Sequence, residues 1–239
     1  MHKLGSTRSA LKRDHLLQTP DTFIRAPLPG MQDATATVHA GPAIGAGFVE
    51  YTAEMQSVGT LGETELQRFL YVLDGAVEVD GNLLESGGYA YVPEGDRLTV
   101  PARSAARVVV IEKKFSPNSE RPAFFTGKEA SVPPQALGGD DDLQVRSLLP
   151  DDLRFDFAVN TMIYQPGAAL SMVEVHVMEH GLLMLEGGGI YRLSDSWYPV
   201  AAGDFIYMAP FCPQWFGALG KVPAKYLIYK DWNRHPAAR

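Results

Sequence analysis

The chain has 239 residues, of which 46% are hydrophobic, and it carries a net charge of −7 at pH 7. This content suffices for one or two buried cores, and the acidic balance does not favour nucleic-acid binding. No apolar run is long enough to cross a membrane, and the single cysteine, Cys212, excludes internal disulfides. Because residues 1–9 lack the apolar core of a secretory signal, we expect a cytoplasmic protein.

Short apolar runs separated by glycine and proline fill the first half of the chain. A polar arm covers residues 1–34, and runs at 69–75, 87–93 and 108–114 follow it. Runs of this kind with few helical periods predict an all-β fold built from jelly-roll barrels. We expect Tyr89, Tyr91 and Val92 to be exposed apolar positions that serve assembly.

The second half of the chain repeats the first. The three runs match residues 181–187, 203–208 and 224–230, at spacings of 112 to 116 residues. The repeat predicts two tandem barrels related by duplication. We place the first barrel at 35–115, a linker rich in Pro, Gly and Asp at 116–145, and the second barrel at 146–239.

The second half also carries a group of side chains that can bind a metal: Glu174, His176, His180 and Gln214. In a strand, Glu174 and His176 would point to one face, and Val175 would point into the opposite apolar layer. His180 would follow across a turn or begin the returning strand.

The spacing of these residues resembles the two cupin motifs. Two ligands separated by one residue, a third ligand and Gly187 fit the first motif, and the run from Gly203 through Pro210 to Gln214 fits the second. Gln214 stands where cupins usually have a histidine. Two other interpretations stay open: polar residues at solvated or core positions of a sheet, and a helical His-x-x-x-His pair, which the glycines at 187–189 disfavour.

The repeat provides an internal comparison for this ligand set. At the matching positions the first half has Gly62, Thr64, Arg68 and Leu98, which cannot form a conventional metal site. We therefore expect a metal only in the second barrel.

Two imidazoles, a carboxylate and an amide oxygen form a fairly hard ligand set that suits Mn²⁺ or Fe²⁺. A neutral glutamine in place of histidine favours hydrolysis or substrate anchoring over oxygen chemistry. Tyr191, Tyr226 and Lys230 could share the cavity, because Tyr226 and Lys230 alternate on one strand; a solvated Lys230 at the strand end is the alternative. We expect Glu179 to be solvated at a turn.

With these residues the chain resembles the (S)-ureidoglycine aminohydrolase family, bicupins of allantoin degradation. The resemblance covers nearly the whole chain. It implies Mn²⁺ held by Glu174, His176, His180 and Gln214, and hydrolysis of a small-molecule substrate, (S)-ureidoglycine, to (S)-ureidoglycolate and ammonia. It further implies substrate contacts from Glu174, Tyr191, Tyr226 and Lys230, catalytic roles for Glu174 and Lys230, and a homo-oligomer.

Two other functions stay open from the residues alone. One is another metallocupin that acts on a small carboxylate as an isomerase, decarboxylase or dioxygenase. The other is a ligand-binding bicupin without catalysis.

Overall fold

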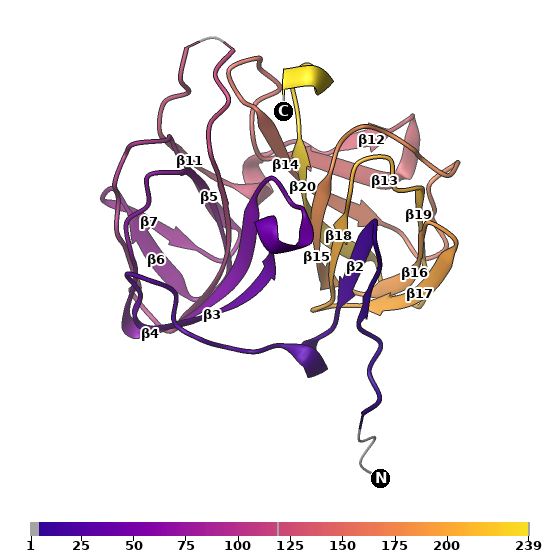
Figure 1. The fold of residues 1–239 in the computed structure, drawn as a ribbon, viewed down its shortest axis with the longest axis horizontal. Helices are drawn as coiled ribbons and strands as arrows, with labels where there is room; N and C mark the ends of the chain where they lie inside the picture. The colour runs from indigo at the N-terminus through magenta and orange to yellow at the C-terminus, as the bar shows by residue number, and fades with distance from the viewer. Residues whose placement is uncertain (1–4, 119, 239) are drawn as a thin grey trace. The chain divides into compact units, whose positions relative to one another are not determined.

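The computed structural model describes residues 5–118 and 120–238, which are built almost entirely from β-strands (Figure 1). Helical turns in these residues are short 3-10 segments: Pro20–Thr22, Pro42–Ile44, Glu129–Ser131 and Pro236–Ala238. The prediction of an all-β fold is confirmed. In the described residues, no helix has the length and apolarity that a membrane crossing requires.

The described chain divides into two compact units. Unit 1 contains residues 5–23, 134–147 and 157–238, and unit 2 contains residues 24–133 and 148–156. Each unit has its own cluster of buried apolar side chains. Part of the N-terminal arm therefore belongs to the same unit as the C-terminal strand.

Unit 1 consists of two antiparallel sheets. The larger sheet has the strand order β1-β2-β18-β15-β20-β14-β13-β12, and the smaller one has the order β17-β16-β19. The strands of the larger sheet are β1 (Ala10–Leu11), β2 (His15–Gln18), β18 (Phe205–Met208), β15 (His180–Glu186), β20 (Ala224–Asp231), β14 (Phe157–Tyr164), β13 (Asp140–Ser147) and β12 (Gln135–Leu137). Those of the smaller sheet are β17 (Ser196–Ala201), β16 (Gly188–Leu193) and β19 (Gln214–Ala218).

Unit 2 has a comparable strand order. Its main sheet runs β11-β8-β5-β10-β4-β3, with β9 beside β4, and β6 and β7 form a separate hairpin. The bounds are β11 (Phe125–Lys128), β8 (Gly88–Val92), β5 (Gln67–Asp74), β10 (Ala106–Lys113), β4 (Val49–Leu61), β3 (Gln32–Ala40), β9 (Val100–Pro101), β6 (Ala76–Val79) and β7 (Asn82–Glu85).

The N-terminal strand β2 completes the large sheet of unit 1. It pairs with β18, so that Leu17 lies opposite Ile206 and His15 lies opposite Met208. Upstream of β2, Arg8 forms a two-pronged ion pair with the fully buried carboxylate of Asp204, at 2.7 and 2.8 Å. These contacts fasten the arm to the turn that precedes β18.

Strand β20 occupies the middle of the large sheet, between β15 and β14 (Figure 1). Its side chains alternate, so that Ala224, Tyr226 and Ile228 all enter the apolar core of unit 1. In this register Lys230 lies opposite His180 on one neighbour and Ala158 on the other. The expected alternation of Tyr226 and Lys230 is thereby confirmed.

The equivalent pairing in unit 2 corrects the predicted alignment of the repeat. Arg68 of β5 lies opposite Glu112 of β10, as His180 lies opposite Lys230. Glu112, and not Lys114, is therefore the positional equivalent of Lys230. The Arg68 guanidinium binds the Glu112 carboxylate at 2.7 Å, so an ion pair occupies this position in unit 2.

The expected exposure of Tyr89, Tyr91 and Val92 is wrong. Their exposed fractions are 6%, 0% and 2%. Strand β8 lies between β5 and β11, and the rings of Phe125 and Phe155 pack against Tyr91 at 5.8 and 5.1 Å between centroids. These apolar side chains are part of the packing of unit 2.

Both copies of the repeated run end in a glycine that the backbone requires. Gly75 and Gly187 have φ values of +74° and +64°, in the left-handed region. A Cβ atom at Gly75 would collide with the carbonyl oxygen of Ala105, and one at Gly187 with that of Pro223. Each strand therefore turns tightly against the segment that leads into β10 or β20.

We expect Gly187→Ala to destabilise the protein by at least about 2 kcal/mol, because left-handed strain and a backbone collision act together. Gly167→Ala is the matched control, because Gly167 has a φ of +92° but a Cβ atom there would have no described neighbour within 4 Å. Urea unfolding measures both variants. Equal losses of unfolding free energy would show that the close approach to Pro223 contributes nothing.

Candidate functional site

A cavity of about 340 Å³ opens in unit 1 among the sequence-predicted site residues. Its wall includes all seven of them: Glu174, His176, His180, Tyr191, Gln214, Tyr226 and Lys230. The remaining lining side chains are mostly apolar, among them Met162, Leu170 and Ile228. A mostly apolar cavity with a few converging polar groups is the usual form of a small-molecule site.

The segment around Glu174 and His176 differs from the predicted strand. Residues 175–179 are irregular, and Glu174 forms an isolated bridge with Gln214 through two backbone hydrogen bonds of 2.9 Å. The His176 carbonyl accepts a hydrogen bond of 2.8 Å from the Phe211 amide. Val175 is 56% exposed, so its expected place in an apolar layer is wrong.

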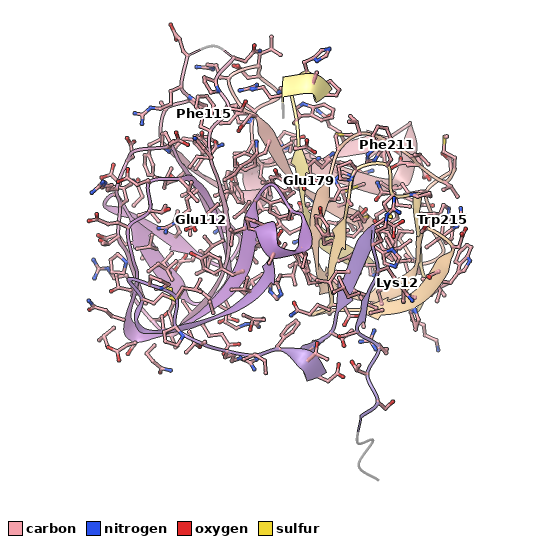
Figure 2. The ribbon with its side chains drawn as sticks, in the orientation of Figure 1. Lys12, Glu112, Phe115, Glu179, Phe211 and Trp215 are labelled. Atoms are coloured by element: carbon pink, nitrogen blue, oxygen red, sulfur yellow. The ribbon has the colours of Figure 1, made fainter. Side chains whose placement is uncertain are left out.

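These backbone contacts tie the irregular segment to the neighbourhood of β19. Phe211 lies in the loop before β19, and Trp215 lies on that strand (Figure 2). The Trp215 indole donates a hydrogen bond of 2.7 Å to the Leu170 carbonyl. The segment that carries Glu174 and His176 is thus attached at both of its ends.

The donor atoms of the four predicted ligands converge in the cavity wall. The Nε2 atom of His176 lies 3.3 Å from Nε2 of His180 and 2.8 Å from the side-chain nitrogen of Gln214. Glu174 Oε2 lies 3.8 Å from the same His176 atom. His180 and Gln214 are buried, whereas Glu174 and His176 are partly exposed and leave a route to solvent.

His180 is held in its neutral form with one nitrogen available. Burial, together with His176 and Lys230, lowers the pKa of His180 well below its usual range. Its Nδ1 atom lies 3.3 Å from the Tyr229 carbonyl and can donate to it, so that the lone pair of Nε2 faces His176.

The four side chains fit a divalent cation. Adjacent ligands on an ion with bonds of about 2.1 Å lie about 3 Å apart, close to the separations found here. A neutral His180 sets its lone pair toward His176 Nε2, and the buried Nδ1 of His176 has no hydrogen-bond partner in the described residues. A proton on Nδ1 of His176 would therefore have no acceptor among these residues, and a proton on its Nε2 would face the nitrogen of Gln214. A cation would accept the lone pairs of these donors instead, once the Gln214 amide turns so that its oxygen faces the ion.

The cavity wall also carries neutral hydroxyls and one ammonium group. The Tyr191 hydroxyl lies 3.4 Å from the Gln214 amide oxygen, and the Tyr226 hydroxyl lies 2.8 Å from that of Tyr164. Burial is the largest cause that raises the pKa of both Tyr191 and Tyr226 well above the usual range. Both phenols therefore stay protonated and can donate hydrogen bonds.

Lys230 lies in the cavity wall. Its Nζ atom is 3.0 Å from the Asn160 amide oxygen, in the orientation that also lets the Asn160 NH₂ donate to the Val159 carbonyl. The same Nζ lies 5.8 Å from the centre of the Trp232 ring. The structure thus places Lys230 where it can meet a bound anion.

Asn160 and Tyr164 are polar neighbours that sequence reasoning missed. Both lie on β14 and, with Met162, alternate on the face that borders the cavity or core. The only local signal was this alternation. Their relation to Lys230 and Tyr226 depends on the pairing of β14 with β20, which the sequence does not specify.

Two other titratable side chains near the site, Glu179 and Cys212, lie outside the cavity lining. Glu179, which is labelled in Figure 2, is 5% exposed, so the expectation that it is solvated is wrong. Its backbone amide donates a hydrogen bond of 2.6 Å to Asp231, and the Tyr207 hydroxyl lies 3.4 Å from its carboxylate. Cys212 is buried, and burial raises the pKa of its thiol to about 11.

A further group of potential ligands lies outside the cavity lining. Asp14, His15 and Cys212 place donor atoms within 4.8 Å of one another. Both ring nitrogens of His15 already have partners, the Asp14 carboxylate at 2.8 Å and the Tyr198 hydroxyl at 2.9 Å. Hydrogen bonding therefore accounts for the position of this histidine.

Known proteins provide an independent comparison. The sequence family described as the cupin domain matches residues 160–229. An (S)-ureidoglycine aminohydrolase from Arabidopsis thaliana is 40% identical over 97% of this chain and 80% of its own length. The (S)-ureidoglycine aminohydrolase of Escherichia coli K12 is 31% identical over 97% of this chain and 94% of its own length.

A solved structure has the same fold. A putative glyoxylate-induced protein from Pseudomonas aeruginosa superimposes with a TM-score of 0.88 at 28% identity, over 98% of this chain and 94% of that one. The fold is thus an all-β cupin fold, and the chain belongs to the (S)-ureidoglycine aminohydrolase family.

Proposed function

We propose that this protein hydrolyses (S)-ureidoglycine to (S)-ureidoglycolate and ammonia in the breakdown of allantoin. Family membership supports the reaction. The observation that carries the proposal to these residues is the convergence of Glu174, His176, His180 and Gln214 at a cavity that also contains Lys230.

We propose Mn²⁺ as the metal, held by these four side chains. The mixture of imidazole nitrogens and oxygen donors supports a fairly hard divalent ion. When bound, the ion supplies Lewis acidity and an anchor for the substrate. The ion pair between Arg68 and Glu112 supports a metal-free unit 2, because it occupies the equivalent position there.

The remaining groups bind and orient the substrate. The substrate carries a carboxylate, an amine and a ureido group on one carbon. Lys230, steadied by Asn160, pairs with the carboxylate, while Tyr191 and Tyr226 donate hydrogen bonds to oxygen acceptors. The apolar side chains around them limit the access of water.

The chemistry exchanges one bond at that carbon. The bond between that carbon and the amine nitrogen breaks, and its electron pair stays on nitrogen. The nitrogen takes up a proton and leaves as ammonia. A water oxygen bonds to the carbon and gives up a proton, and Glu174 is the proposed proton carrier. A positioned acid–base group of this kind contributes about 10²–10⁴-fold to a rate.

Purified protein should contain one metal ion per chain and release ammonia from (S)-ureidoglycine. His176→Ala should lose most of the metal and nearly all activity, because it removes the ligand nearest the other three. The exposed His235→Ala is the control and should keep both. Elemental analysis beside an ammonia assay measures the outcome.

Two ions per chain, or full metal content in His176→Ala, would contradict the ligand assignment. Metal without ammonia release would identify another metallocupin. Tight ligand binding with neither metal nor turnover would identify a binding protein.

Lys230→Met should lower kcat/KM about 10- to 150-fold, since a charge-assisted hydrogen bond contributes roughly 1.5–3 kcal/mol. Metal content should not change, because Lys230 is not a proposed ligand. Lys225→Met on the same strand is the control, since Lys225 lies outside the cavity lining. Near-wild-type turnover by Lys230→Met with its metal intact would reject the carboxylate contact.

We further propose two tandem jelly-roll barrels, with the first barrel near 35–115 and the second near 146–239. The arm at 1–34 and the linker at 116–145 complete this division. The separate apolar cluster of each unit and the similar order of strands in the two large sheets support this division. A cytoplasmic location is also proposed, supported by the absence of internal disulfides in a chain with one cysteine.

We also propose a homo-oligomer. Exposed large apolar side chains in both units support it, among them Met172, Phe211, Ile24 and Val58. Light scattering at micromolar protein concentration should give a mass of at least two chains. A monomeric mass would overturn the proposal.

A further inference from the structure

The hydroxyls of Tyr164 and Tyr226 form a pair at the cavity wall. They lie 2.8 Å apart on the neighbouring strands β14 and β20. Tyr164 is fully buried and does not line the cavity, whereas Tyr226 does. Within the described residues, the Tyr164 hydroxyl has the Tyr226 hydroxyl as its hydrogen-bond partner.

The position of the shared proton follows from what each hydroxyl can do. A phenol can donate one hydrogen bond and can also accept. If Tyr226 donated to Tyr164, the Tyr164 proton would be buried without an acceptor, which is costly. If Tyr164 donates instead, the Tyr226 proton is left to point into the cavity, where substrate or water can accept it.

Packing holds both rings in this arrangement. The Phe216 ring meets Tyr164 edge-on at 4.9 Å and Tyr226 edge-on at 5.8 Å between centroids. The two tyrosine rings are 5.6 Å apart. This packing restricts movement of the two tyrosine rings and so keeps their hydroxyl oxygens close together.

We propose that Tyr164 is a positioning residue that makes Tyr226 an obligate hydrogen-bond donor to an acceptor oxygen of the substrate. By donating to Tyr226, Tyr164 also polarises that hydroxyl and strengthens its outgoing hydrogen bond. The inference rests on the proposed function for the substrate, but the hydroxyl pair itself does not depend on it.

A double-mutant cycle of Tyr164→Phe and Tyr226→Phe tests the kinetic part. Tyr164→Phe keeps the ring and should lower kcat/KM about 2- to 12-fold, the equivalent of one neutral hydrogen bond. In the Tyr226→Phe background the same change should have no further effect, because its only target is gone. A merely structural role would give the same factor in both backgrounds and would overturn the proposal.

Unfolding in urea tests the pair without any substrate. Tyr226→Phe leaves the Tyr164 hydroxyl buried without its partner, so the urea midpoint should fall; the double variant should recover toward wild type. Additive losses would overturn the pairing. Tyr91→Phe is the control, because it removes a buried tyrosine hydrogen bond of 2.9 Å to Gln67 in unit 2 and should leave kcat/KM unchanged.

These readouts separate the two ideas. A wild-type protein that does not act on (S)-ureidoglycine overturns the proposed function and with it the substrate part of this inference. Urea unfolding of the single and double variants still tests whether the two hydroxyls are paired. Active wild type with unaffected Tyr164→Phe overturns only the inference.

Discussion

The antiparallel pairing of β20 with β14 and β15 is the constraint on which the site depends. The side chains on one face of β20 lie in the apolar core or line the cavity, and β14 and β15 present their own side chains beside them. His180 thereby lies opposite Lys230, while Asn160 and Tyr164 come within hydrogen-bond distance of Lys230 and Tyr226. A slip of one residue would turn Tyr226 and Lys230 out of the cavity wall.

The site combines this regular sheet with an irregular segment. The sheet supplies His180, Tyr226 and Lys230 from rigid strands, whereas Glu174 and His176 come from a stretch held by backbone bonds to Gln214 and Phe211. In a regular strand, Glu174 and His176 would point to one face in a straight row. The irregular segment instead brings both side chains toward His180 on β15 and leaves an opening toward solvent.

The cavity wall brings together groups of different charge. The neutral His180 lies with His176, Glu174 and Gln214, whose donor atoms a cation would satisfy. The protonated phenols of Tyr191 and Tyr226 and the ammonium of Lys230 suit oxygen acceptors and an anion. Unit 2 has the same strand pairing, yet Arg68 and Glu112 neutralise each other at the equivalent position. The two units therefore share this strand pairing but differ in the side chains that the pairing brings together.

The sequence by itself predicted the all-β class, the repeated glycines at 75 and 187, and seven of the residues that line the cavity, because strand alternation and motif spacing are local properties. It misjudged whatever depends on neighbours from elsewhere in the chain: the burial of Tyr91 beneath Phe155, the burial of Glu179, and the alignment that sets Glu112 at the position of Lys230. Asn160 and Tyr164 belong to this second group. Only the tertiary structure places them, because strand register is a contact between distant segments and no local pattern encodes it.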